Sequence, residues 1–143
     1  MQISQLLRRK GQDVATIDGG QSVRDALHLL AQHRIGALVV SADGRHIDGI
    51  LSERDIARGL DERGADLLTE PVSAVMTAEV RTCGPEAGVH DLARMMTDHR
   101  IRHIPVVDAG ALVGIVSIGD VVKARLDELE SERAQLVDYI QTA

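Results

Sequence analysis

The feature of this sequence that most constrains its fold is an internal repeat. Residues 14–56 and residues 80–121 carry the same kinds of apolar and polar residues in the same order. The copies begin 66 residues apart, but Gly49 and Gly114 lie 65 apart, so the copies differ by one residue in a turn. Each unit is too short to bury its apolar face alone. The sequence therefore predicts two similar halves, packed as a pseudo-symmetric pair with two related clefts between them.

Each copy has the pattern of a β-α-β-β-α unit. Apolar residues recur at i, i+3, i+4 and i+7, which is the spacing of one helix face, and Ser22 can cap the first of these helices. A short apolar strand, a turn with glycine and a second strand follow, and a second helix begins at Ser52 or Ser117. We expect an α/β (α+β) fold with the sheets of the two halves facing each other. The helical spacing is carried by Val23, Ala26, Leu27 and Leu30, and by Val89, Leu92, Ala93 and Met96.

The chain divides into three parts. Residues 1–62 hold the first repeat, residues 63–125 hold a polar linker and the second repeat, and residues 126–143 continue as an amphipathic helix that departs from the repeat. The apolar residues of this last helix alternate in steps of four and three, which is typical of a coiled-coil seam. It either lies on its own domain or pairs with a second chain, and we favour the second. The seam consists of Val122, Leu126, Leu129, Leu136 and Ile140, with Arg133 at the skipped position.

Composition excludes several function classes. The 143 residues include no Phe or Trp and one Tyr, so a flat ligand ring must be held between aliphatic side chains. The formal net charge of −6 and the lack of a basic run argue against nucleic-acid binding. No stretch has the length and apolarity of a membrane span, and the N-terminus has no signal sequence. Cys83 is the single cysteine, so a reducing cytoplasm is the expected setting.

The strongest local motif occurs in both copies. Residues 49–55 read Gly-Ile-Leu-Ser-Glu-Arg-Asp, and residues 114–120 read Gly-Ile-Val-Ser-Ile-Gly-Asp. In the simplest interpretation the serine caps a helix and the aspartate complements the helix dipole. In the functional interpretation the helix N-terminus faces a phosphate and the fixed carboxylate accepts hydrogen bonds from a ribose diol. Because the motif is duplicated, we favour a nucleotide site.

The order apolar-apolar-Pro-Val-Val-Asp, a turn, and then Gly-Ile-Val-Ser-x-x-Asp resembles the cystathionine-β-synthase (CBS) domain. Two such units in tandem resemble a Bateman module, and the resemblance covers about residues 1–125. It implies a pair of repeats that assembles into disc-like dimers. It also implies adenosine-containing ligands, namely AMP, ADP or ATP and in some members NAD(H) or S-adenosylmethionine, with no obligatory cofactor.

The resemblance also implies two clefts, each of which combines one Ser-x-x-Asp motif with residues from the other half. The first, which we call the Asp120 cleft, would consist of Ser117, Asp120, Lys10, Ala15, Ile35 and Gly36. The second, the Asp55 cleft, would consist of Ser52, Arg54, Asp55, Met76, Ile101, Arg102 and His103. The Asp55 cleft carries more positive charge for phosphate oxygens, because Gly119 and Gly36-Ala37 stand where it has Arg54 and Arg102-His103.

Other constellations are weaker. His99 and His103 lie four apart, which on a helix suits a metal pair, but a helix is expected to end between them. No nucleophile–base pair, phosphate-binding loop or catalytic metal motif is present, so we do not expect an enzyme. The sequence favours a nucleotide sensor that forms a homodimer and passes a change of shape to an unknown effector protein. The alternatives are a structural or interaction protein with empty clefts, or a metal-binding module.

Overall fold

The first repeat folds as the expected β-α-β-β-α unit. The computed structural model describes residues 1–142. The strands β1 (Thr16–Ile17), β2 (Ala37–Val40) and β3 (Gly49–Ser52) form a sheet in the order β1-β2-β3, with β1 parallel to β2 and β2 antiparallel to β3. The first helix of this repeat begins after Ser22, whose hydroxyl accepts a hydrogen bond from the Asp25 amide at 3.1 Å. It ends at Arg34, whose backbone lies in the left-handed region at φ 54°. The helices of this half are α2 (Val23–His33) and α3 (Glu53–Arg63).

The second repeat keeps this order but lacks a full first strand. It contains α4 (Val89–His99), β4 (His103–Asp108) and β5 (Ala111–Ser117), and β4 and β5 form an antiparallel sheet. Where we expected a first strand, only Cys83 makes a parallel bridge, with Val106. Pro85 follows two residues later and has no amide hydrogen to extend the ladder. The second sheet is therefore narrower than the first.

The start of the chain completes the second half. Residues Ile3–Lys10 form helix α1, which we did not expect. Ile3, Leu6 and Leu7 are buried and pack in one cluster with Val89 and other residues of the second repeat. The Ile3 amide also donates to the Ala87 carbonyl at 2.9 Å. We expected residues 1–62 to form the first half, but the first ten residues pack with the core of the second half.

The linker between the halves is ordered and partly buried. It forms two short 3-10 helices, η1 (Gly64–Thr69) and η2 (Val72–Ala74). Leu67 and Val72 have no exposed surface and belong to the core of the first half. Thr77 then pairs with Ile50 of β3, the amide of each donating to the carbonyl of the other at 2.9 Å. This pairing fixes the path along which the chain crosses to the second half.

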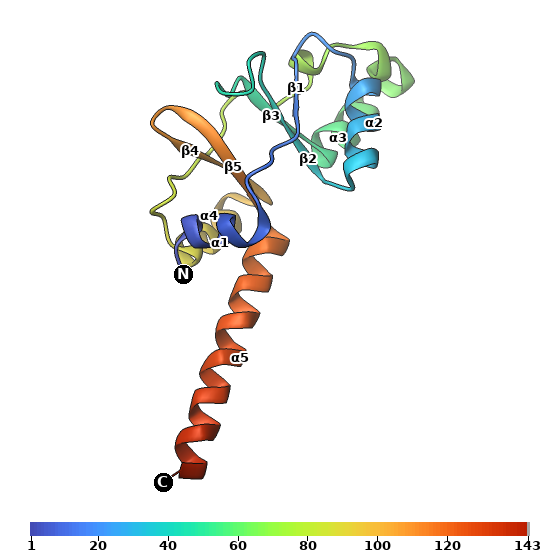
Figure 1. Ribbon diagram of the computed structural model, residues 1–143. Helices are drawn as coiled ribbons and strands as arrows, with labels where there is room; N and C mark the ends of the chain where they lie inside the picture. Colours follow the sequence, from blue (N-terminus) through green and yellow to red (C-terminus); the bar gives the residue numbers. More distant parts are fainter. Residues whose placement is uncertain (143) are drawn as a thin grey trace.

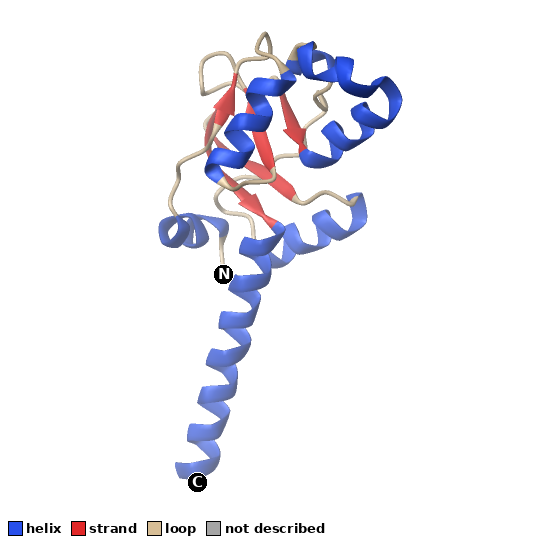
Figure 2. Cartoon of the chain, turned by 90° about the vertical axis from the view of Figure 1, so that its right-hand side faces the viewer, coloured by secondary structure: helices blue, strands red, loops and turns tan. Residues whose placement is uncertain are grey.

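The two sheets lie beside each other in the middle of the body. Helices α2 and α3 lie on the outer side of the first sheet, and α1 and α4 lie on the outer side of the second (Figures 1 and 2). Helix α5 (Ile118–Thr142) begins at the end of β5 and projects away from the body. Within residues 1–142, no helix is long and apolar enough to cross a membrane.

Candidate functional site

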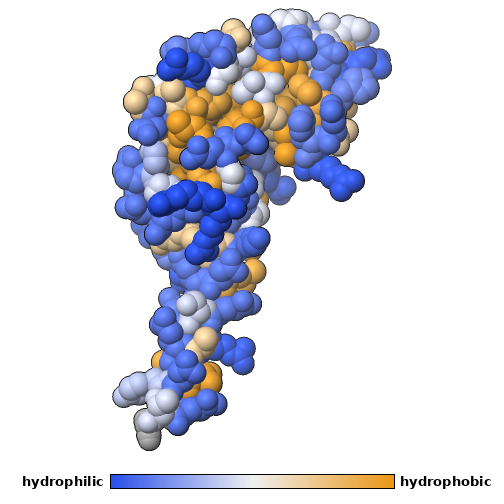
Figure 3. All heavy atoms as spheres, viewed as in Figure 1, coloured by the Kyte–Doolittle hydropathy of each residue, from blue (hydrophilic) through white to orange (hydrophobic). Residues whose placement is uncertain are grey.

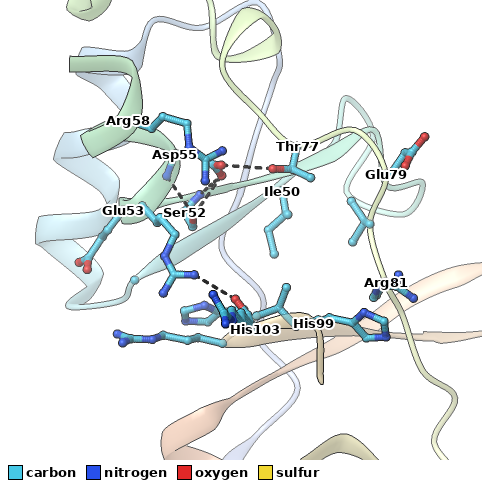
Figure 4. Close-up of a pocket in the computed structure, with 16 residues that line it drawn as sticks. Ile50, Ser52, Glu53, Asp55, Arg58, Thr77, Glu79, Arg81, His99 and His103 are labelled. Atoms are coloured by element: carbon cyan, nitrogen blue, oxygen red, sulfur yellow. Dashed lines mark hydrogen bonds between the residues drawn. The ribbon is translucent and has the colours of Figure 1, made fainter. Parts of the chain in front are cut away.

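The motif of residues 52–55 forms a rigid acidic corner where β3 passes into α3. The Ser52 hydroxyl accepts a hydrogen bond from the Asp55 amide at 3.2 Å, which caps the helix. In return, one Asp55 oxygen (Oδ2) accepts from the Ser52 amide at 2.9 Å and from the Ser52 hydroxyl at 3.0 Å. The other oxygen (Oδ1) accepts from the Thr77 hydroxyl at 3.2 Å (Figure 4). The Asp55 carboxylate is therefore held in one orientation before any ligand arrives.

This corner forms one wall of a pocket of about 660 Å³ between the two halves. Ser52, Asp55 and Thr77 lie on one side of it, and His99 and His103 lie on the opposite side (Figure 4). Residues of both repeats and of the linker therefore meet at one cavity. The lining residues are Gly36, Ile50, Ser52, Glu53, Arg54, Asp55, Arg58, Thr77, Glu79, Val80, Arg81, His99, Arg100, Ile101, Arg102 and His103.

The lining of the pocket is rich in arginine. The five arginines outnumber the three carboxylates, which belong to Glu53, Asp55 and Glu79. The guanidinium of Arg54 donates to the Arg100 carbonyl at 3.0 Å, which links α3 to the end of α4 across the halves. Arginine presents planar donors that match phosphate oxygens, so the pocket suits an anionic group.

His103 lines the pocket from the first residue of β4 (His103–Asp108). Its imidazole faces Gly36, where an added Cβ would come within 3.2 Å of the His103 Cε1 atom. Burial lowers the pKa of His103 below its usual value of 6.5 because it disfavours the charged imidazolium, although the carboxylates of Glu53 and Asp120 oppose that shift. The neutral imidazole is thereby favoured in the folded protein.

The second motif has the same local geometry in different surroundings. The Asp120 amide donates to the Ser117 hydroxyl at 3.1 Å, and the Ser117 amide donates to the Asp120 carboxylate at 2.8 Å. Here the ammonium of Lys10 lies 2.6 Å from the same carboxylate and also donates to the Ile115 carbonyl at 2.8 Å. Burial raises the pKa of Asp120, but the Lys10 ammonium and the Ser117 hydrogen bonds outweigh burial, so the net shift is downward.

The structure brings together most of the residues expected in the Asp55 cleft. Ser52, Arg54, Asp55, Ile101, Arg102 and His103 all line the pocket, together with Gly36, which we had expected in the other cleft. Met76 does not line it. Its side chain packs on the core of the first half and close to Gly49, where an added Cβ would come within 2.6 Å of the Met76 sulfur.

In the Asp120 cleft, the structure brings Lys10, Ser117 and Asp120 together as expected. Ala15 and Ile35 are partly buried against the core of the first half. The Ala15 carbonyl accepts from the Val39 amide and the Ile35 amide donates to the Leu30 carbonyl, so both hydrogen bonds stay within the first half.

The sequence reasoning missed several lining residues. Arg58 follows Asp55 by three positions on α3, and this helical spacing was a usable signal. Arg100 and His99 come from the end of α4, next to the expected Ile101. Thr77 and Glu79 belong to the linker, where no periodicity indicates the direction of a side chain. Val80 and Arg81 begin the second repeat, and Arg81 stands 66 residues after Ala15, which was expected in the other cleft, so the repeat itself was a usable signal.

The histidine pair does not lie on one helix. His99 is the last residue of α4 and His103 is the first residue of β4. Among residues 1–142, no group of three or more His, Cys, Asp or Glu side chains is placed to hold a metal ion. Burial raises the pKa of Cys83 to about 11, and the nearby charge of Glu86 adds to the shift. The neutral thiol therefore predominates at neutral pH.

The fold and the two Ser-x-x-Asp motifs define a tandem pair of pseudo-symmetric domains. Residues 3–62 and 72–127 match the CBS domain family. The chain therefore belongs to that family and carries two CBS domains, which confirms the family and fold expected from the sequence.

Three known proteins illustrate the similarity. The chain is 38% identical over 149 residues to the CBS domain-containing protein CBSX3, mitochondrial, of Arabidopsis thaliana, covering 97% of this chain and 71% of the relative. It is 44% identical to the CBS-domain containing protein ATU1752 from Agrobacterium tumefaciens, with a TM-score of 0.84 over 87% of this chain and 99% of that chain. It is 25% identical to the CBS domain pair of protein MJ0100, with a TM-score of 0.78 over 90% of this chain and 98% of that chain. That pair was solved with 5′-methylthioadenosine and S-adenosyl-L-methionine.

Proposed function

We propose that this chain is a regulatory protein that binds an adenosine nucleotide in the Asp55 cleft. The observation that carries the proposal is a carboxylate fixed on one wall of an arginine-rich pocket of about 660 Å³. A fixed carboxylate suits the two hydroxyls of a ribose, and the arginines suit phosphate oxygens. The complex of the related MJ0100 pair with adenosine-containing ligands supports this ligand class.

The pocket gives each part of the ligand a different environment. The ribose would lie against Asp55, whose Oδ1 atom already accepts from the Thr77 hydroxyl. The base would lie between aliphatic side chains, for which Ile50, Val80 and Ile101 are available. The phosphates would contact Arg54, Arg102 and His103, as the family resemblance implies. The excess of arginine favours AMP, ADP, ATP or NAD(H) over the cationic S-adenosylmethionine.

The Asp120 cleft is the second, weaker candidate site. Its lining would include Ala15, Ile35, Gly36 and Ser117, as the resemblance implies. In the observed state, Lys10 pairs with the carboxylate that a ribose would use, at 2.6 Å. A ligand entering this cleft has to compete with or displace that ammonium group. We therefore expect one tight site per chain and a weaker second one.

Regulation follows from where the ligand binds. A nucleotide in the Asp55 cleft contacts the first half, the linker and the second half at once, so it favours one arrangement of the halves over others. We propose that a homodimer passes this change to an effector protein without catalysing a reaction of its own. The single free cysteine suits a reducing compartment such as the cytoplasm.

Thermal unfolding with and without ligand tests the proposal directly. AMP, ADP, ATP, NADH and S-adenosylmethionine are added in turn, and a ligand at about 100 times its Kd should stabilise the fold by about 2.7 kcal/mol. Calorimetry then gives the affinity and the stoichiometry. If none of these ligands binds, the alternative of an interaction protein with empty clefts is favoured instead. Mass spectrometry of the purified protein identifies any ligand that is retained from the cell.

A further inference from the structure

The imidazole of His103 lines the Asp55 cleft without a hydrogen-bond partner of its own. It lies on the wall opposite Asp55 (Figure 4). Among residues 1–142, the imidazoles of His46 and His90 form hydrogen bonds with other side chains, whereas that of His103 forms none. Because no fully buried side-chain nitrogen or oxygen of these residues lacks a partner, the ring nitrogens of His103 are not sealed off from the pocket. A ligand in the pocket can therefore bind to the ring directly.

The space for this imidazole comes from Gly36. An added Cβ at Gly36 would lie 3.2 Å from the His103 Cε1 atom and 3.5 Å from its Nε2 atom. The same Cβ would lie 3.8 Å from the carboxyl carbon of Glu53, so the carboxylate and the imidazole both flank this glycine. In the repeat, Gly36 and Ala37 stand where the second half has Arg102 and His103. The first half therefore has no equivalent histidine.

Charged groups of both signs act on His103. Burial disfavours the imidazolium and lowers the pKa of His103. The carboxylates of Glu53 and Asp120 oppose this shift. The cations of Lys10 and Arg102 add to it, so the neutral imidazole is favoured while no ligand is bound. The other ionisable side chains that line the same pocket are those of Arg54, Asp55, Arg58, Glu79, Arg81, His99 and Arg100.

Apolar side chains near His103 strengthen the effect of any charge that is brought into the pocket. Ile50 and Ile101 line the same pocket, and Ile104, the next residue of β4, has no exposed surface. Where the two halves meet, hydrophobic side chains lie at the surface among hydrophilic ones (Figure 3). Charges are screened less well in such surroundings than in open water, so an anion bound in the pocket acts strongly on His103.

We propose that His103 takes up a proton from solvent when the phosphate of a nucleotide binds in the Asp55 cleft, so that nucleotide affinity rises as the pH falls. This inference rests on the proposed function and adds a regulation by pH to it. The phosphate brings negative charge to the ring and offsets the cations of the pocket, and both changes favour the imidazolium. The charged ring then donates a hydrogen bond to a phosphate oxygen. Because at most one proton is taken up by the ring, the affinity changes by at most about tenfold per pH unit.

Calorimetry of ATP binding measures the proton uptake directly. ATP is titrated into the full chain at one pH in two buffers with different ionisation enthalpies, and the difference in heat gives the number of protons taken up. The wild type should take up more protons than His103→Gln, and its affinity should rise several-fold more between about pH 7.5 and about pH 6.5. The difference between the two proteins is the quantity compared, because the terminal phosphate of ATP itself titrates in this range. Proton NMR of the wild-type chain gives an independent measurement without a substitution, since ATP should raise the pKa of His103.

Two comparisons locate the proton. Adenosine has no phosphate, so its binding should give the same proton uptake in the wild type and in His103→Gln. His99→Gln removes the exposed histidine of the pocket and should keep most of the uptake that ATP causes. Equal uptake of protons with ATP in the wild type and in His103→Gln, or a loss of uptake in His99→Gln alone, overturns the inference and leaves nucleotide binding in place. If ATP does not bind to the wild type at any pH, the proposed phosphate site fails and the inference fails with it.

Discussion

The two Ser-x-x-Asp motifs have the same local structure, but their carboxylates have different partners. Both aspartates cap a helix and accept a hydrogen bond from the amide of their own serine, at 2.9 Å for Asp55 and 2.8 Å for Asp120. The further partner of Asp55 is the neutral Thr77 hydroxyl, whereas that of Asp120 is the Lys10 ammonium. A duplicated motif thus leaves one carboxylate with its charge available and neutralises the other.

The comparison shows that the Ser-x-x-Asp motif fixes the local geometry of the carboxylate, whereas the surrounding residues determine whether a ligand can bind there. Ser52 and Asp55 open onto a pocket with five arginines. Ser117 and Asp120 are joined by a lysine from the opposite end of the chain, 110 residues away. The motif alone would predict equal binding in both halves. The surroundings predict that a nucleotide binds at Asp55, whereas the charge of Asp120 is paired within the protein.

Asp55→Asn should have the largest effect on binding. The amide keeps much of the cap but loses the charged acceptor for the ribose, which should weaken nucleotide binding by roughly 1.5–3 kcal/mol. Isothermal calorimetry with the preferred nucleotide measures the change. Asp91→Asn is a matched control, because Asp91 occupies the equivalent capping position in α4 and does not line the pocket. Unchanged affinity in Asp55→Asn would remove the proposed ribose site.

Arg102→Ala should have a smaller effect that depends on the ligand. Arg102 lines the pocket, and a lost phosphate contact should weaken AMP or ATP by about tenfold while adenosine changes little. Competition binding with the three ligands gives the ratio. Arg24→Ala removes an exposed arginine on α2 that does not line the pocket and should change none of them. An equal loss for adenosine and ATP would place Arg102 away from the phosphates.

Lys10→Met should make the two clefts more alike. The variant removes the partner of Asp120 and should lower the free energy of unfolding by up to about 1 kcal/mol, because the pair is partly exposed. It should also raise the number of nucleotides bound per chain, since the Asp120 carboxylate becomes available. Chemical denaturation and calorimetric stoichiometry measure the two effects. If nucleotide binding falls instead, Lys10 contacts the ligand and does not compete with it.

His103 should give the smallest effect, which is a change of stability with pH. Its folded-state pKa lies below 6.5 because of burial, so the unfolded chain takes up a proton more readily. The free energy of unfolding should therefore fall as pH drops from about 6.5 through the lower, folded-state pKa. Denaturation at neutral and mildly acidic pH should show a shallower fall in His103→Gln than in the wild type. The same substitution at the exposed His28 is the control for the loss of a histidine as such.

Local pattern predicted much of the fold. Apolar residues at i, i+3, i+4 and i+7 indicated the helices α2 and α4, and the Ser-x-x-Asp motifs indicated where α3 and α5 begin. These features depend on residues within a few positions of each other, so they can be read along the chain. The first strand of the second repeat was less predictable. Pro85 interrupts its hydrogen bonding and leaves only the Cys83 bridge.

The candidate site was predicted only in part. Arg54, Asp55 and Arg102 were expected in one cleft and line one pocket. The contributions of Thr77 and Glu79 were not expected, because side chains of an extended linker have no periodic direction. Their positions depend on the pairing of the linker with β3, which joins segments more than 20 residues apart. Such pairing reflects the packing of the whole first half and not the linker sequence itself.

By itself, the sequence determined the repeat, the family and the helices and strands that follow from local patterns, but not helix α1 or the missing first strand of the second repeat. The tertiary structure decided which half the first ten residues complete and which aspartate is neutralised. Helix α1 packs into the second core, and this brings Lys10 to Asp120. Burial of Ile3, Leu6 and Leu7 favours that docking. The hydrophobic effect depends on the apolar area that is buried and not on where the residues lie in the sequence. The sequence already indicated more positive charge beside Asp55, and the folded chain adds that the Lys10 ammonium is bound directly to the Asp120 carboxylate.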